Sequence, residues 1–251
     1  MSSDHPSRPG TIVVLSDSLA YYGAGGGLPA DDPTIWPNIV GRDCGRPVRL
    51  FGRIGWTSRD IWWALTQDPN MWAALPHADA VVLAFGGMDS LPSPLPTALR
   101  EQIRYLRPNR LRQSVRDAYA WVQPRAARAG WPMALPPKIT VEYLEKIRSA
   151  LAHLRPDLPI VVCLPPTHRS PYYGYVHAGR LPTTGAMLAW ARAHDLPTVD
   201  FYPVTRDAFT DTPGEMNPDG IHWGAECHRG IAAVATPVVA AVLGSTPSRS
   251  Q

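Results

Sequence analysis

The sequence predicts a three-layer α/β/α sandwich around a parallel five-stranded sheet, with a helical cap inserted into it. Short apolar runs alternate along the chain with longer stretches of helical periodicity. The apolar runs are nearly continuous in valine, isoleucine and leucine, without period-two alternation, which is typical of parallel strands covered on both faces. Repeated strand–helix units then favour a parallel sheet with helices on each side.

Five strands and five helices follow from these patterns. The predicted strands are Thr11–Leu15, Val48–Phe51, Ala80–Ala84, Ile160–Leu164 and Thr198–Asp200. The predicted helices are Thr34–Asp43, Ser58–Gln67, Val141–Leu154, Thr184–His194 and Ala225–Leu243. Sites in open sheets of this kind form beyond the carboxyl ends of the strands, so we expect the functional residues at that edge.

One stretch breaks the alternation, because residues 90–138 separate the third and fourth strands by more than a typical crossover. We therefore predict a single domain over residues 1–251, with residues 90–138 as its cap. The stretch is rich in arginine and also holds Tyr105, Trp121 and Trp131. Its arginines are Arg100, Arg104, Arg107, Arg110, Arg112, Arg116, Arg125 and Arg128. Arg100, Arg104 and Arg107 are predicted to share one helix face. The segment is either a solvated basic face or a cap over the site that attracts an anionic substrate.

Composition restricts the class of protein. A chain of 251 residues with 45% apolar and 18% charged residues is globular and builds a full core. A net charge of +3 and the lack of a recognition motif disfavour nucleic acid as a partner. Residues 1–10 lack the apolar core of a signal peptide. The longest apolar stretch, Ile231–Leu243, is too short to span a bilayer and contains Pro237, so we expect no stable membrane insertion.

Cysteine usage points to a reducing compartment. Cys44, Cys163 and Cys227 are odd in number and widely spaced, which argues against a disulfide framework or a zinc site. We therefore expect a cytoplasmic protein.

The candidate catalytic residues lie near the two ends of the chain. Ser18 follows the first strand, and Asp219 and His222 lie three residues apart some 200 positions later. A serine nucleophile needs a base to take its proton and a carboxylate to orient that base, and this trio supplies all three. Alone, each half has an ordinary interpretation, since serine after a strand is often a helix N-cap and Asp-x-x-His is often a surface turn.

Two glycine-containing blocks lie between these segments, each just past a predicted strand. Arg53-Ile54-Gly55-Trp56-Thr57 follows the second strand, and Gly86-Gly87-Met88-Asp89 follows the third. Glycine at such a position lets backbone N–H groups approach a ligand closely.

In order along the chain, these blocks resemble the SGNH/GDSL superfamily of serine esterases and acyltransferases. The matching segments are Ser16-Asp17-Ser18-Leu19, Gly55 in its turn, Gly86-Gly87-Met88-Asp89 and Asp219-Gly220-Ile221-His222. The resemblance implies that Ser18 is the nucleophile, His222 the base and Asp219 its orienting carboxylate. It also implies an oxyanion hole made by the Ser18 and Gly55 amides, with no metal and no cofactor.

The third block departs from the family pattern, because Met88 stands where the family has an oxyanion asparagine. A thioether donates no hydrogen bond, and loss of one oxyanion donor typically costs about 100- to 1,000-fold in rate. Three alternatives follow: a slow enzyme, a substitute donor, or an oxyanion hole of two amides. Met88 is also a candidate to line an acyl pocket.

A closer resemblance, to an actinobacterial family of sugar acyltransferases, is carried by Ser18–Gly23, Gly52–Thr57, Gly86–Pro94 and Asn217–Trp223, and it implies a substrate class. In that family an octanoyl chain moves from acyl-CoA, as co-substrate, to a sugar hydroxyl of a glucosylglycerate in methylglucose lipopolysaccharide synthesis. Arginine suits the carboxylate and the phosphates of such substrates. The predicted substrate-binding residues are Met88, Arg53, Arg59, Trp56, Arg169 and Tyr22. Two rivals are a carbohydrate or short-chain esterase, and a non-catalytic sugar- or lipid-binding relative.

Overall fold

The centre of the protein is a parallel sheet of five strands. The computed structural model describes residues 10–23, 25–93, 95, 102–129, 132–210 and 219–245. The strands are β1 (Thr11–Asp17), β4 (Val48–Arg53), β5 (Ala78–Ala84), β6 (Ile160–Leu164) and β7 (Thr198–Asp200). Their order in the sheet is β4-β1-β5-β6-β7, and every neighbouring pair is parallel. The predicted fold class is thus confirmed.

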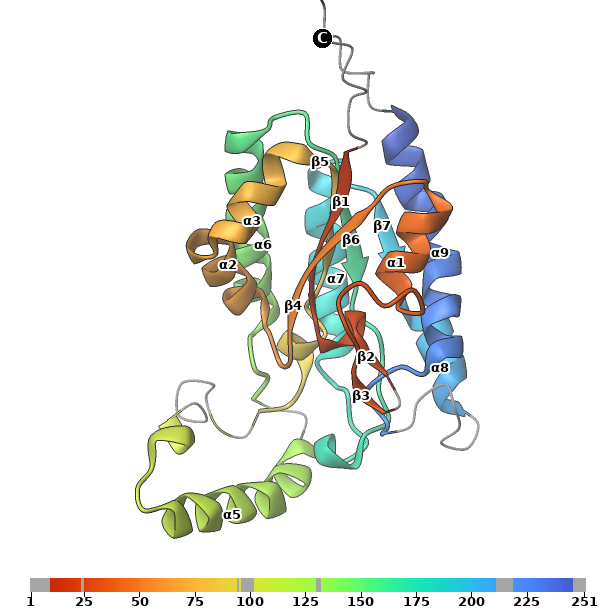
Figure 1. The fold of residues 1–251 in the computed structure, drawn as a ribbon. Coiled ribbons are helices and arrows are strands. Elements are labelled where there is room, and N and C mark those ends of the chain that lie inside the picture. Colours follow the sequence, from red (N-terminus) through yellow and green to blue (C-terminus); the bar gives the residue numbers. More distant parts are fainter. Residues whose placement is uncertain are drawn as a thin grey trace, which may run out of the picture.

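Helices cover both faces of this sheet (Figure 1). One face carries α2 (Ser58–Gln67), α3 (Pro69–Ala74), α6 (Pro137–Leu154) and α7 (Arg180–Ala193), and the other carries α1 (Trp36–Asp43), α8 (Tyr202–Thr210) and α9 (Ala225–Ser245). The strands feed both cores because successive side chains point to opposite faces. In β1, Val13 and Leu15 join one apolar cluster, whereas Ile12 and Val14 join the other.

The apolar stretch Ile231–Leu243, predicted to be too short to span a bilayer, is part of the longer helix α9. By length and composition alone, α9 is able to cross a membrane. It packs, however, against α1 and β7, and it buries Cys227, Ile231, Ala235 and Val239 in the core. One face of α9 therefore packs in the core of the protein.

Several short elements were not predicted from the sequence. They are α3, α8 and the small hairpin β2 (Tyr22–Gly23) with β3 (Gly26–Gly27). β1 also runs two residues further than its apolar run, through Ser16 and Asp17. These two polar residues remain in the ladder beside β4, and Ser16 Oγ donates to the Ala84 carbonyl at 2.8 Å.

The described part of the insertion contains the turn η4 (Ile103–Tyr105) and the long helix α5 (Asn109–Ala127). Figure 1 shows α5 set off from the sandwich, at the end where β1 leads into β2 and β3. Within α5 only Ala127 is buried, and the helix contacts the turn η5 (Pro171–Tyr173). Whether the insertion covers the site stays a prediction.

The predicted arginine face of the insertion is wrong. Arg104 lies in η4, and Arg107 lies between η4 and α5 rather than in a helix. The physical reason is Pro108, because its ring disfavours helical geometry at the residue before it. Arg100 and Trp131 lie outside the described residues.

All three cysteines are free, two of them buried and Cys44 partly so.

Candidate active site

Ser18 lies where β1 turns into the short helix η1 (Ser18–Ala20). The N-cap of this turn is Asp17, whose Oδ1 accepts from the Leu19 amide at 2.9 Å. The Ser18 side chain therefore has no capping role, and it lies 3% exposed at the carboxyl edge of the sheet. The local structure leaves its hydroxyl available for another partner.

That partner is His222. Ser18 Oγ and His222 Nε2 are 3.0 Å apart, and His222 Nδ1 lies 2.6 Å from Asp219 Oδ2. Because the carboxylate accepts from Nδ1–H, Nε2 is left as the acceptor that faces the serine hydroxyl. Residues 204 positions apart thus form the hydrogen-bonded chain that nucleophilic catalysis requires.

Asp219 also builds the loop that carries His222. Its Oδ1 accepts from the amides of Ile221 at 2.8 Å and His222 at 2.7 Å. Partial burial alone would raise the pKa of Asp219, but the hydrogen bonds from the His222 ring and from these two amides lower it below its ordinary value. The carboxylate therefore stays ionised, which suits an imidazole that becomes cationic during proton transfer.

A second loop holds this one in place. Gly220 has a φ of +80°, and a Cβ there would lie 2.5 Å from the Arg169 carbonyl oxygen, so only glycine fits. The Arg169 amide donates to the Gly220 carbonyl at 2.8 Å. The loop after β6 therefore fixes the loop of Asp219 and His222 against the end of β1.

Gly55 lies in the turn between β4 and α2, as predicted. Its φ is +74°, and Trp56 N donates to the Arg53 carbonyl to close the turn. Among the described residues, the Gly55 amide has no acceptor. It is therefore free to bind an oxyanion.

Met88 begins the turn η3 (Met88–Ser90) after β5, and it borders a narrow pocket that Ser18 also lines. The pocket has a volume of about 30 Å³, room for roughly two water molecules. Most of its wall is apolar, from Leu19, Met88, Leu91, Pro166 and Ile221. Met88, at the position where the family pattern has its asparagine, thus lines the same pocket as Ser18.

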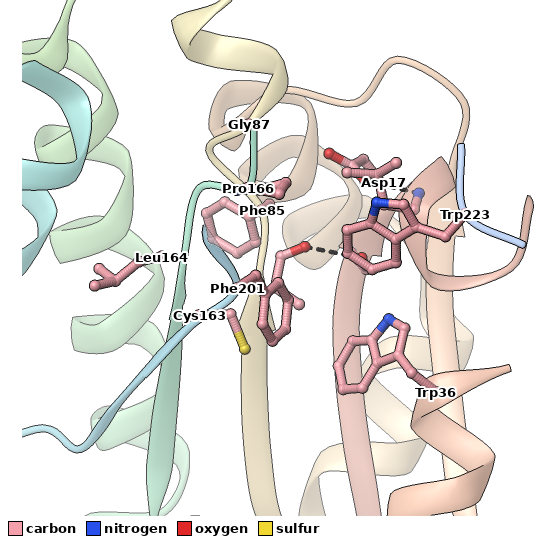
Figure 2. A pocket seen from close by; sticks show the side chains of 12 residues that line it. Asp17, Trp36, Phe85, Gly87, Cys163, Leu164, Pro166, Phe201 and Trp223 are labelled. Carbon is pink, nitrogen blue, oxygen red and sulfur yellow. Dashed lines mark hydrogen bonds between the residues drawn. The ribbon is translucent and has the colours of Figure 1, made fainter. Parts of the chain in front are cut away.

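A buried acid directly before Ser18, Asp17, was not predicted from the sequence. Asp17 is 2% exposed, and Figure 2 shows it at a small cavity beside the rings of Phe201 and Trp223. Burial raises the pKa of Asp17 to about 7, and the nearby Asp89 charge adds to this against the Leu19 amide bond. With this pKa, a substantial fraction of Asp17 is protonated near neutral pH. The signal in the sequence was an acid directly continuing a buried strand.

The aromatic candidates divide between the site and the core. Tyr22 packs on the His222 ring, with centroids 4.1 Å apart and an interplanar angle of 33°. Tyr22 therefore helps to orient the imidazole. Trp56 instead packs, partly buried, against the core cluster under α2.

The three arginine candidates differ in their surroundings. Arg59 pairs with Asp60 at 3.6 Å and lies over the Trp63 ring at 4.7 Å, so neighbours on its own helix engage it. Arg53 is exposed at the end of β4, in register with Asp17. Arg169 is exposed in the loop that holds Gly220. Arg53 and Arg169 remain the better predictions for an anionic substrate.

Comparison with known proteins agrees with this geometry. A profile of the GDSL-like lipase/acylhydrolase family matches residues 17–229. The chain belongs to this family. The match spans the strand end with Ser18 and the loop with Asp219 and His222, so it includes the whole candidate site.

Two curated relatives are more similar still. The chain is 55% identical over 235 residues to a diglucosylglycerate octanoyltransferase of Mycobacterium tuberculosis, covering 92% of each chain. It is 55% identical over 225 residues to the diglucosylglycerate octanoyltransferase of Mycolicibacterium hassiacum, covering 90% of this chain and 92% of the other. The protein is an acyltransferase of the GDSL family.

Solved structures support the fold. A lipase/acylhydrolase from Enterococcus faecalis superposes with a TM-score of 0.61 at 16% identity, covering 96% of this chain and all of the other. A carbohydrate acetylesterase family member from Sinorhizobium meliloti gives a TM-score of 0.55 at 18% identity, covering 93% of this chain and 99% of the other. At such low identity these likenesses speak for architecture alone.

Proposed function

We propose that this protein transfers an octanoyl group from an acyl-CoA to a sugar hydroxyl of diglucosylglycerate. The observation that carries the proposal is the hydrogen-bonded chain from Ser18 through His222 to Asp219, with distances of 3.0 and 2.6 Å. The proposed substrate class is supported by two relatives named diglucosylglycerate octanoyltransferase, which are 55% identical to this chain over nine-tenths of its length. We place the reaction in the cytoplasm, as a step of methylglucose lipopolysaccharide synthesis.

The first half-reaction forms an acyl-enzyme. Ser18 Oγ attacks the thioester carbonyl while His222 Nε2 takes the hydroxyl proton. The Ser18 and Gly55 amides stabilise the oxyanion of the tetrahedral intermediate. The C–S bond then breaks, and His222 returns the proton to the leaving coenzyme A sulfur.

The second half-reaction uses the same groups in reverse. A sugar hydroxyl attacks the acyl-enzyme as His222 takes its proton, and collapse of the intermediate returns a proton to Ser18 Oγ. The products are the sugar ester and free Ser18. No cofactor enters either half, and Asp219 orients the imidazole throughout.

An esterase would use the same acyl-enzyme with water as the acceptor, and the low-identity structural neighbours include such enzymes. The names of the two closely similar relatives favour transfer over hydrolysis. A non-catalytic binding role is disfavoured by the intact geometry around Ser18.

Mass spectrometry of the product tests the proposal. The protein is incubated with octanoyl-CoA and a panel of glucosylglycerates, with folded Ser18→Ala as the matched control. We expect an octanoyl ester of diglucosylglycerate with the wild type and none with the variant. Octanoic acid as the sole product would favour the esterase, and product from Ser18→Ala would refute the nucleophile.

A further inference from the structure

Two histidines border the same narrow pocket as Ser18 without belonging to the catalytic trio. His168 follows β6 in the loop that holds Gly220, and His177 precedes α7. Their rings pack together, with centroids 4.4 Å apart. Each ring has one buried nitrogen without a hydrogen-bond partner among the described residues: Nε2 of His168 and Nδ1 of His177.

The hydrogen bonds of His177 decide which nitrogen carries its proton. Ser90 Oγ lies 2.7 Å from the Gly87 carbonyl, which only accepts, so the single hydroxyl proton of Ser90 goes there. Ser90 Oγ must then accept from His177 Nε2, which is 2.8 Å away. Nδ1 of His177 is therefore unprotonated, and no donor among the described residues hydrogen-bonds to it.

His168 has the opposite arrangement. Its Nδ1 accepts from the Ser170 amide at 3.2 Å, so in the neutral ring the proton lies on Nε2. Nε2 of His168 is therefore a donor with no acceptor. Burial lowers the pKa of His168 to about 4 and, together with the charges of His168 and Arg180, lowers that of His177 well below its ordinary value. Both rings are thus neutral near pH 7.

The two packed rings both line the pocket, and one carries an unpaired donor while the other carries an unpaired acceptor. This pair is complementary to a hydroxyl group, which both donates and accepts. We propose that His168 and His177 form a hydroxyl-binding subsite for the sugar acceptor: His168 Nε2–H donates to one acceptor hydroxyl, and that hydroxyl donates to His177 Nδ1. These two contacts orient the acceptor beside Ser18. The inference rests on the proposed transfer to a sugar.

The other parts of the substrates fit this position less well. Neutral imidazoles offer no charge to the phosphates of coenzyme A. An alkyl chain would leave both buried nitrogens without hydrogen-bond partners, which is unfavourable.

Deoxy-sugar acceptors combined with two variants test the proposal. Kinetics are measured with diglucosylglycerate and with a set of its monodeoxy analogues, using wild type, His168→Phe and His177→Phe. Phenylalanine keeps the ring packing and removes the nitrogens. In the wild type, we expect one deoxy analogue to lower kcat/KM at least tenfold more than the others, because its loss leaves both nitrogens unpaired. The variants should have a lower kcat/KM for the parent acceptor than the wild type has. In each variant, the kcat/KM for that same analogue should be less than threefold below the kcat/KM for the parent.

Controls separate this subsite from the rest of the site. His77→Phe changes an exposed histidine in η2 (Leu75–His77), at the opposite end of the sheet, and should match the wild type with every acceptor. Hydrolysis of nitrophenyl octanoate, which needs no sugar, should stay within threefold of wild type in all variants. If the wild type transfers octanoyl to no glucosylglycerate, the proposed function itself fails.

Two results would overturn the subsite. One is that His168→Phe and His177→Phe discriminate among the deoxy analogues as the wild type does. The other is a loss of nitrophenyl octanoate hydrolysis as large as the loss of transfer, which makes the rings structural. Should either variant fail to fold, ¹⁵N NMR of folded Ser18→Ala gives the answer. Diglucosylglycerate must shift the His168 Nε2 and His177 Nδ1 signals, and unchanged signals would mean that they face bound water only.

Discussion

Replacement of Asp219 by asparagine should reverse the tautomer of His222. In the structure, Oδ1 of Asp219 accepts two backbone hydrogen bonds, from Ile221 and His222, while Oδ2 accepts one from the His222 ring. An asparagine has one oxygen and one NH₂ group for these two places. With the NH₂ on the Oδ1 side, it would meet two N–H donors and lose both bonds, at about 1 kcal/mol each. The NH₂ group will therefore face the ring.

An NH₂ group facing Nδ1 moves the imidazole proton to Nε2. Nε2 then donates to Ser18 Oγ across the 3.0 Å contact and no longer accepts from it. The equivalent change in a serine protease triad lowers turnover by about 10⁴-fold. This corresponds to about 5.4 kcal/mol on the barrier, at 1.36 kcal/mol for each factor of ten. Since the loop keeps its two backbone bonds, the thermal midpoint of Asp219→Asn should stay close to that of the wild type.

The assay is hydrolysis of nitrophenyl octanoate, read with the thermal midpoint of each protein. We expect Asp219→Asn to lose most of its kcat with little change in KM, because only the transition state needs the base. Asp157→Asn, in the exposed turn after α6, is the matched control and should behave as wild type. A folded Asp219→Asn within tenfold of the wild-type kcat would refute the tautomer argument and the role of Asp219.

Three further expectations follow from the site and the insertion. Met88→Asn should preserve or raise hydrolysis of a small activated ester by adding an oxyanion donor, while the polar amide in an apolar wall weakens the use of octanoyl donors; faster turnover with octanoyl-CoA would contradict the second part. Asp17 has a pKa of about 7 when folded against an ordinary 3.8, so the folded protein is progressively destabilised as pH rises from about 4 to 7. Asp17→Asn lacks this titration, so its thermal midpoint should rise relative to that of the wild type as the pH rises from about 4 to 7. A difference between the two midpoints that stays constant with pH would mean that Asp17 ionises normally. Arg107 and Arg110 border an open, solvent-exposed concavity at the start of α5. Changing both to glutamine should therefore raise the KM for octanoyl-CoA, more at low salt, and leave the KM for nitrophenyl octanoate unchanged. Equal effects on both donors would make these arginines structural.

The sheet was readable from the sequence because its strands are buried on both faces. A strand such as Ile160–Leu164 is apolar throughout, and it appears in the structure with the predicted bounds. The helix Ser58–Gln67 was equally well defined, by its apolar spacing. The arginine spacing in the insertion wrongly predicted one shared helix face. The reason is that the ring of Pro108 sterically disfavours helical geometry at Arg107.

The candidate catalytic residues were also predicted from the sequence, because the segments around Ser18, Asp219 and His222 resemble those of a known family in order along the chain. Serine, histidine and aspartate are also the side chains that nucleophilic catalysis uses. Their distances were not readable, since two segments 204 residues apart meet only when β1 and the loop before α9 reach the same edge of the sheet.

The environment of each buried side chain in the site was determined by the tertiary structure alone. The sequence does not show that burial raises the pKa of Asp17, because the surrounding rings come from distant segments such as Phe201 and Trp223. Nor does it show that the rings of His168 and His177, nine positions apart, pack together, with one donor and one acceptor that have no partner among the described residues. Side-chain identity and short-range spacing belong to the sequence. Desolvation and hydrogen-bond pairing depend on which segments the fold brings together, and only the folded chain fixes them.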